Sequence, residues 1–325
     1  MQMVERRTKE WSLLVGLGLV GVFAYFGTRK REKVIAAIET GGMSVKVAVA
    51  KDHPLNIVAE SSFTTTTPGE TLAAVAQWLK QWSVDHVGVA SFGPVDLDPT
   101  SPTYGFITST PKKEWRDTPL LKDLGRLLNF HKPIGFNTDV NAAALAEFTY
   151  GEHPCSHSLV YITIGNGVGV GVITGGQVLR GLVHPEGGHV IVTRHPHDSA
   201  PSICPFHTFC AEGMATNMAI ATRLGVDPTA LKDVPDDHSV WELEAYYLAQ
   251  VCLNVTLVLS PEVIVVGGGV MNRAKLLPLI QAQFSALLND YVKHPKFSTK
   301  DYIRMPRLQN AGLVGAALLA LNSNP

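Results

Sequence analysis

VIAAIETGGMSVKVAVA, at residues 34–50, has a counterpart in SLVYITIGNGVGVGVIT at residues 158–174. Each stretch sets two apolar, β-branched runs on either side of a glycine-rich turn, which is the pattern of two strands joined as a hairpin. One such stretch opens each half of the chain, and strand-like and helical patterns follow it. The sequence therefore predicts an α/β protein with two similar lobes around a cleft.

Apolar spacing and turn residues place further elements outward from these two hairpins. A stretch rich in Pro, Thr and Ser at residues 94–115 predicts a long loop, and long loops in compact domains are often functional. Helical spacing at residues 311–321, with Asn310 as the N-cap, predicts a closing helix. Other strands are expected at residues 57–63, 86–91, 134–138 and 263–268, and other helices at residues 69–82, 120–130, 142–150, 213–224, 240–259 and 275–288.

The composition is that of an ordinary globular protein. The 325 residues suffice for two domains, and 46% of them are hydrophobic and 17% charged, which excludes a disordered chain. The net charge of −1 excludes a general basic surface for nucleic acid. Any phosphate chemistry therefore depends on donors that are placed locally.

The N-terminal segment is predicted to be separate from the lobes. Residues 11–28, WSLLVGLGLVGVFAYFGT, carry no charge and have basic residues on both sides. Such a run is at the short end of what spans a bilayer, and a buried core helix fits poorly because the run is apolar on all sides. Residues 1–33 are therefore expected to form a membrane anchor with a basic flank. The balance of basic residues favours a single-pass protein whose body faces the cytosol.

Three glycine-rich turns and one aspartate indicate phosphate chemistry. The turns lie at residues 41–42, 165–169 and 267–269, and glycine lets backbone N–H groups approach phosphate oxygens closely. Asp139 follows an expected strand and opens an expected helix. A carboxylate there can accept the proton of a hydroxyl group that attacks phosphorus. The alternative role for this aspartate is that of a helix N-cap.

The strongest local signal is a cluster of thiols and imidazoles. Cys204, His207 and Cys210 form the run C-x2-H-x2-C, and HPEGGH at residues 184–189 supplies His189 as a fourth ligand. Two thiolates and two imidazoles with no open position predict a structural zinc ion that fixes a long polar loop. The alternative fourth ligands are His184, His195 and His197.

From about Val34 to Leu321 the sequence resembles the ROK family of sugar kinases and repressors, specifically its fructokinase branch. The resemblance rests on IETGG, ASFGPVDLDPTSPTYGFITSTPK, NTDVNAAALAE, YITIGNGVGVGV, GLVHPEGGH, RHPHD, CPFHTFCAEG, PEVIVVGGGVM and NAGLVGAA. HPEGGH and CPFH are the most specific of these, because they mark the zinc-bearing loop of the family. No DNA-binding helix-turn-helix precedes the kinase body, which disfavours the repressor branch.

The resemblance implies a fold similar to that of actin and hexokinase, with two ribonuclease H-like α/β lobes. The first lobe is expected at residues 34–140, joined by a C-terminal helix at residues 311–325, and the second lobe at residues 141–310. The implied activity is that of an ATP-dependent hexose kinase that makes fructose 6-phosphate, with Mg²⁺ accompanying ATP. Family members are often dimers, so a homodimer is allowed for.

The resemblance also assigns roles to single residues. Asp139 matches the general base that takes the proton of the sugar 6-hydroxyl. The positions that match hexose ligands are Thr138, Asn141, Glu186, His189 and Glu212. Those that match ligands of the ATP phosphates are Gly41, Gly42, Ser44, Gly165, Asn166 and Gly167, and those at the adenosine edge are Gly267, Gly268 and Gly269. The positions that match ligands of a structural zinc ion are His189, Cys204, His207 and Cys210.

Two positions depart from the family's usual phosphate loops. Met43 stands where the first loop usually has threonine, with Ser44 adjacent, and Asn166 stands where the second loop usually has threonine. Loss of one charge-assisted phosphate contact lowers the stabilisation of the transition state by roughly 1.5–3 kcal/mol, which slows the reaction about 10- to 100-fold. These two positions and the expected anchor leave the alternative of a catalytically weak, membrane-tethered sugar-binding protein. A glucose or mannose kinase is a further alternative, since the same carboxylates can hold several hexoses.

Overall fold

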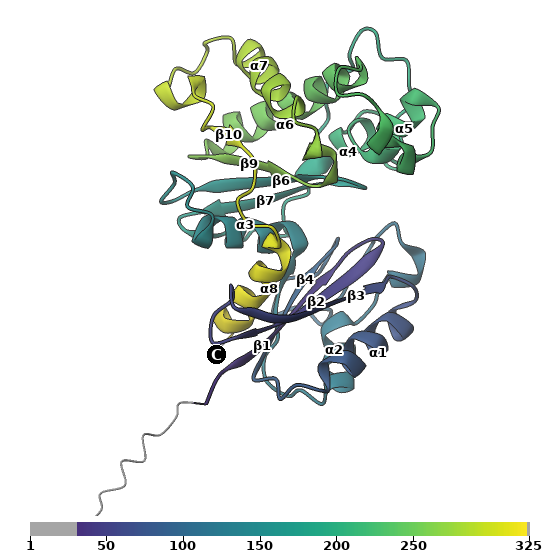
Figure 1. The fold of residues 1–325 in the computed structure, drawn as a ribbon, viewed down its shortest axis with the longest axis vertical. Helices are drawn as coiled ribbons and strands as arrows, with labels where there is room; N and C mark the ends of the chain where they lie inside the picture. The colour runs from purple at the N-terminus through teal and green to yellow at the C-terminus, as the bar shows by residue number, and fades with distance from the viewer. Residues whose placement is uncertain (1–30, 324–325) are drawn as a thin grey trace, which may run out of the picture. The chain divides into compact units, whose positions relative to one another are not determined.

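Two five-stranded sheets of matching topology form the framework of residues 31–323, the part of the chain that the computed structural model describes (Figure 1). In each sheet the two strand pairings on one side of the central strand are antiparallel, and the two pairings on the other side are parallel. The prediction of two similar α/β lobes is therefore confirmed. The first sheet has the order β3-β2-β1-β4-β5, with β1 (Val34–Thr40), β2 (Ser44–Lys51), β3 (Ile57–Thr64), β4 (His86–Ser91) and β5 (Gly135–Thr138). The second sheet has the order β10-β9-β6-β7-β8, with β6 (Leu159–Ile164), β7 (Val168–Thr174), β8 (Gln177–Val178), β9 (Ile264–Gly267) and β10 (Ile303–Arg304).

The helices lie close to the ranges that apolar spacing predicts. They are α1 (Pro68–Leu79), α2 (Leu120–Leu128), α3 (Asp139–Tyr150), α4 (Ala211–Met214), α5 (Asn217–Leu224), α6 (Val240–Leu259), α7 (Leu276–Leu288) and α8 (Ala311–Asn322). The single helix predicted at residues 213–224 is wrong, because Thr216 Oγ1 accepts the N–H of Ala219 and starts α5 as a new helix. Asn310 precedes α8, but its side chain makes no capping bond and donates instead to Glu60 Oε1 at 3.3 Å.

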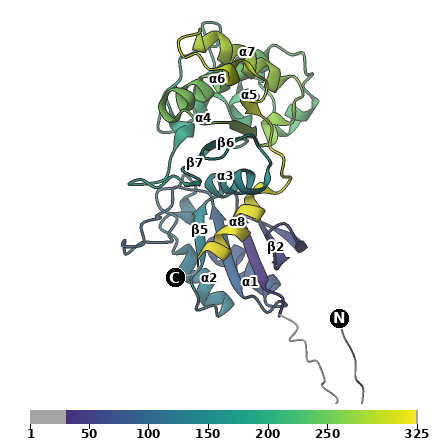
Figure 2. The ribbon, with the colours of Figure 1, turned by 90° about the vertical axis from the view of Figure 1, so that its left-hand side faces the viewer.

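Helices α3 and α8 pack against each other and lie between the two sheets (Figure 2). Helix α8 contacts β1 and β4, whereas α3 contacts β6 and β7. The first sheet turns its small side chains toward α8, and its larger Val and Ile side chains pack with α1 and α2 on the other face. The small residues on the α8 face include Ala37, Ala48, Ala50 and Ala90.

Two glycines let these central helices approach their neighbours closely. A Cβ atom on Gly88 of β4 would lie 1.9 Å from the carbonyl oxygen of Ala316 in α8. A Cβ atom on Gly315 of α8 would lie 2.0 Å from the carbonyl oxygen of Ala142 in α3. Backbone therefore packs on backbone at both contacts, which bring α8 close to β4 and to α3, the helix that Asp139 begins.

The predicted membrane anchor at residues 11–28 lies outside the described residues. Among residues 31–323, no helix combines the length and the apolar character that crossing a bilayer requires. Helix α6 has 20 residues, but it carries Glu242 and Glu244 and buries most of its apolar side chains in the core of the second lobe. The prediction of a single-pass, membrane-anchored protein with a cytosolic body is therefore wrong as far as residues 31–323 are concerned, where no helix supplies the span.

Candidate active site and metal centre

A cavity of about 800 Å³ gathers most of the side chains that the sequence singles out. Residues of both sheets and of the loops that follow them line it. The predicted residues that line this cavity are Gly42, Thr138, Asp139, Gly165, Asn166, Gly167, Glu186, His189, His207 and Glu212. The remaining lining includes Phe92, Gly93, Pro94, Lys112 and His184.

Asp139 reaches this cavity from the first turn of α3. Thr138 is the N-cap of that helix, since its Oγ1 accepts the N–H of Asn141 at 3.1 Å. Thr138, and not Asp139, is therefore the N-cap of this helix. Burial raises the pKa of Asp139 to about 7, and the carboxylates of Glu39 and Glu186 add to the rise. A carboxylate with such a pKa can both accept and release a proton near neutral pH.

Glu186 lines the same cavity as Asp139 and lies beside a histidine. Burial in the cavity raises the pKa of Glu186 to about 7, with a further contribution from the Glu212 carboxylate. Its Oε1 lies 3.5 Å from Nδ1 of His184, whose side chain is 4% exposed. Nε2 of His184 accepts the backbone N–H of Val95 at 3.1 Å. His184, considered from sequence only as an alternative zinc ligand, thus connects the loop after β4 to a predicted hexose ligand.

Glu212 connects the second glycine turn to the predicted zinc cluster. Its Oε2 accepts the backbone N–H of Val168 at 3.2 Å. Its Oε1 lies 3.7 Å from Nε2 of His189. A Cβ atom at position 167 would lie 2.9 Å from the same carboxylate, so the glycine there makes room for it. This carboxylate therefore fixes the relative position of the turn and the imidazole.

The four predicted zinc ligands come together. One ligand atom of each of His189, Cys204, His207 and Cys210 lies within 4.8 Å of the others. Nδ1 of His189 lies 3.8 Å from Cys204 Sγ and 3.6 Å from Cys210 Sγ, and Nδ1 of His207 lies 3.6 Å from Cys204 Sγ. Tetrahedral zinc with the usual Zn–S and Zn–N lengths separates sulfur from nitrogen by about 3.6 Å. The donor set and its spacing therefore fit zinc, and the alternative ligands His184, His195 and His197 lie outside the cluster.

Other predicted residues do not line the cavity. Asn141 is fully buried; its Oδ1 accepts the N–H of Val172 and its Nδ2 donates to Asn137 Oδ1, which secures α3 against β7. Gly41 and Ser44 close the first turn through a backbone bond of 2.9 Å. Of the three glycines at residues 267–269, the first ends β9 and the other two follow it, and all three also lie outside the lining.

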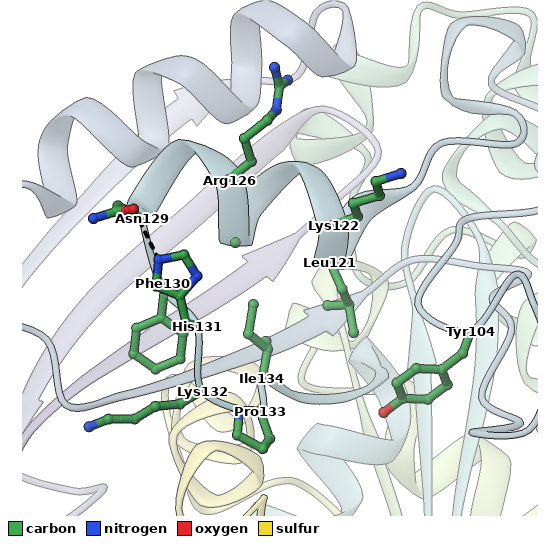
Figure 3. Close-up of a pocket in the computed structure, with 11 residues that line it drawn as sticks. Tyr104, Leu121, Lys122, Arg126, Asn129, Phe130, His131, Lys132, Pro133 and Ile134 are labelled. Carbon is green, nitrogen blue, oxygen red and sulfur yellow. Dashed lines mark hydrogen bonds between the residues drawn. The ribbon is translucent and has the colours of Figure 1, made fainter.

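A second pocket, of about 620 Å³, lies over α2 and the segment that follows it (Figure 3). Its basic side chains do not converge: Lys122 and Arg126 point away from Leu121 and Ile134 in Figure 3, and Lys132 Nζ donates to the carbonyl of Asp85 at 3.0 Å. None of the residues that the sequence singles out lines this pocket. The chemistry therefore gathers in the larger cavity.

Comparison with known proteins identifies the family and the fold of this chain. The model of the ROK family matches residues 35–323. A fructokinase of Lactococcus lactis subsp. cremoris is 40% identical over 85% of this chain and 92% of its own length, and a fructokinase of Pediococcus pentosaceus is 39% identical over 88% and 97%. A ROK family glucokinase from Streptomyces griseus, solved with glucose and AMPPNP, superposes with a TM-score of 0.71 at 22% identity and covers 89% of this chain and 99% of its own, which shows a shared fold. The chain is a member of the ROK family.

Proposed function

We propose that this protein is an ATP-dependent fructokinase that transfers the γ-phosphoryl group of ATP to the 6-hydroxyl of fructose. One observation carries the proposal: the Asp139 carboxylate shares a cavity with Glu186, His189, Glu212 and two glycine turns. Relatives named fructokinase that are 39–40% identical over most of the chain support fructose as the acceptor.

Asp139 acts as the general base. As the 6-oxygen of the sugar attacks the γ-phosphorus, the new O–P bond forms and the bond to the bridging oxygen of ADP breaks. The hydroxyl proton passes to the Asp139 carboxylate. Because burial and neighbouring carboxylates raise the pKa of Asp139 to about 7, this group accepts the proton more readily than an ordinary aspartate does.

Glu186, His189 and Glu212 hold the hexose. Their carboxylate and imidazole groups are directional acceptors and donors for sugar hydroxyls, and all three line the cavity with Asp139. Thr138 lines the same wall. A hexose held by these groups would present one hydroxyl to the base and to the phosphate.

The glycine turns receive the phosphates of ATP. Gly42 and the turn at residues 165–167 line the cavity with little side-chain bulk, so backbone N–H groups can reach phosphate oxygens. Met43 is 70% exposed and lies outside the lining, so this departure from the usual phosphate loop does not block the cavity. Mg²⁺ bound with ATP would offset charge on the phosphates.

His189, Cys204, His207 and Cys210 would hold a structural zinc ion. With four protein ligands the ion has no open position, so its contribution is to fold the loop that carries these residues. His189 also lines the cavity, so the shape of this loop determines where one sugar ligand lies.

Steady-state kinetics of the purified full-length chain with ATP, Mg²⁺ and a panel of fructose, glucose and mannose test the proposal. We expect the highest kcat/KM for fructose, and a loss in kcat of about 10²–10⁴-fold in Asp139→Asn. Glu114→Gln, which changes an exposed carboxylate outside the cavity, should keep the wild-type rate. Absence of turnover on every hexose, or full activity in Asp139→Asn, would overturn the proposal.

A further inference from the structure

Among the aspartate, glutamate, lysine and arginine side chains that line the candidate active site, all but one are acidic. Asp139, Glu186 and Glu212 line the cavity, and Lys112 is the one lysine or arginine among the described residues that line it. ATP would bring several negative charges into this site. A phosphoryl-transfer site generally places a cation where charge develops on the transferred group.

The Lys112 side chain lies beside the first glycine turn. Its Cε atom is 3.7 Å from the position of a Cβ atom built on Gly42. Lys112 is partly buried, and its ammonium group makes no hydrogen bond or ion pair with the described residues. The lysine of the hairpin itself is placed differently, since Lys46 Nζ lies 4.0 Å from Glu39 Oε2. An unpaired cation thus stands next to the turn that we assign to phosphate.

The loop that carries Lys112 is well anchored. Trp115 is 1% exposed, and its Nε1 donates to the carbonyl of Thr66 at 2.8 Å. Arg116 Nε donates to the carbonyl of Thr110 at 2.8 Å. The Lys112 N–H reaches Thr110 Oγ1 at 3.4 Å, and its carbonyl accepts the N–H of Trp115 at 2.9 Å. The backbone on both sides of Lys112 is therefore fixed before any nucleotide binds.

We propose that Lys112 binds the γ-phosphoryl group of ATP and is a catalytic residue of the transfer, an inference that rests on the proposed kinase function. As the sugar oxygen bonds to phosphorus and the bond to the ADP oxygen breaks, negative charge spreads over the equatorial oxygens of the phosphoryl group. The Lys112 ammonium neutralises that charge, while the hydroxyl proton goes to Asp139. A lysine from this loop thus supplies the cation at the first turn.

Three variants of the full-length chain test this role. Lys112→Met removes the charge and keeps much of the length, and Lys112→Arg keeps the charge. Lys113→Met is the matched control, because Lys113 is the next residue, is exposed and lies outside the cavity lining. Circular dichroism melts first establish that each variant folds, and the partly buried position of Lys112 predicts a melting temperature close to that of the wild type.

We expect Lys112→Met to lower kcat on fructose about 10²–10³-fold, with a KM for fructose within about 3-fold of the wild-type value. Calorimetric titration supplies a readout without turnover. The wild-type chain should bind AMPPNP more tightly than ADP, and Lys112→Met should lose about 10-fold of that preference. Lys112→Arg should recover part of both losses, and Lys113→Met should match the wild type.

The outcomes separate this inference from the proposed function. An unchanged kcat and an unchanged preference for AMPPNP in Lys112→Met would overturn the role of Lys112 while the kinase function stands. A raised KM for fructose with an unchanged AMPPNP preference would also overturn it, because Lys112 would then contact the sugar. A third outcome combines two results: the wild-type chain phosphorylates no hexose, and Lys112→Met loses the preference for AMPPNP that the wild-type chain shows. This outcome would overturn the proposed fructokinase function, whereas the contact between Lys112 and the γ-phosphate would stand.

Discussion

Oε2 of Glu147 lies 2.6 Å from Nε2 of His153, and neither side chain is exposed. The same carboxylate accepts the backbone N–H groups of Arg307, at 3.1 Å, and Leu308, at 2.8 Å. Glu147 lies near the end of α3, whereas residues 307–308 belong to the segment that leads from the second sheet into α8. One carboxylate thus joins the end of α3 to the segment that leads into α8.

Replacement of Glu147 by leucine should lower the free energy of unfolding by about 3–5 kcal/mol, because it leaves the buried His153 and two partly buried backbone N–H groups without an acceptor. Guanidinium chloride unfolding measures the change. Glu152→Leu is the control, since Glu152 is 85% exposed and its ion pair with Arg307 lies at the surface. A loss below about 1 kcal/mol in Glu147→Leu would contradict the structural role of this carboxylate.

The pH profile of kcat/KM should rise with pH through an apparent pKa near 7. Catalysis requires the ionised form of Asp139, and burial together with the Glu39 and Glu186 carboxylates raises its pKa to about 7. In Glu39→Gln one negative neighbour is removed, so ionisation of Asp139 becomes easier and the acidic limb should move to lower pH. A limb that stays at the same pH, or moves upward, in Glu39→Gln would refute this coupling. Glu114→Gln should leave the limb in place.

Metal analysis of the purified chain should give about one zinc ion per molecule. Cys204→Ser should lose most of that zinc and lower the melting temperature, because the loop that carries the ligands loses its support. It should also raise the KM for fructose, since His189 lines the cavity. Cys155→Ser is the control, because Cys155 lies outside the cluster. Equal zinc content in the two variants would show that the ligand set is wrong.

His184→Leu should raise the KM for fructose about 10-fold with a smaller change in the KM for ATP. The substitution removes the acceptor of the Val95 N–H and the imidazole beside Glu186, so the Glu186 carboxylate loses its orientation. In His184→Gln an amide oxygen can accept the Val95 N–H, and much of the affinity should return. If His184→Leu raised the two KM values equally, or if His184→Gln restored nothing, this positioning role would be excluded.

The sequence predicts most of the fold because its apolar patterns are local. Strands with a glycine turn between them are visible in residues 34–50, and their counterpart in residues 158–174 predicts the second sheet. The break between α4 and α5 escapes prediction, because both sides keep helical spacing and only the capping geometry of Thr216 separates them. The very short strands β8 and β10 have no periodicity of their own and form only where a neighbouring strand pairs with them.

The residues of the candidate site also fall into those that the sequence predicts and those that it does not. The metal cluster can be predicted because three of its residues follow each other at fixed spacing in one loop. Lys112 and His184 cannot, since each acquires its place from a residue distant in sequence, Gly42 in one case and Val95 in the other. Asn141 shows the reverse: it lies only two residues after the predicted base, Asp139, but its side chain is buried in the core. Distance along the chain is a poor guide to which polar side chains face a cavity formed by two lobes.

The backbone contacts at Gly88 and Gly315 determine which variants this protein tolerates. Any side chain at either position would push α8 away from β4 or α3, so even alanine should prevent assembly of the fold. A saturation screen scored by growth would rank both glycines beside Asp139, although neither lies at the cavity. Two measurements distinguish a catalytic position from an architectural one. The rate per correctly folded molecule falls in an Asp139 variant, whereas the yield of correctly folded molecules falls in a glycine variant.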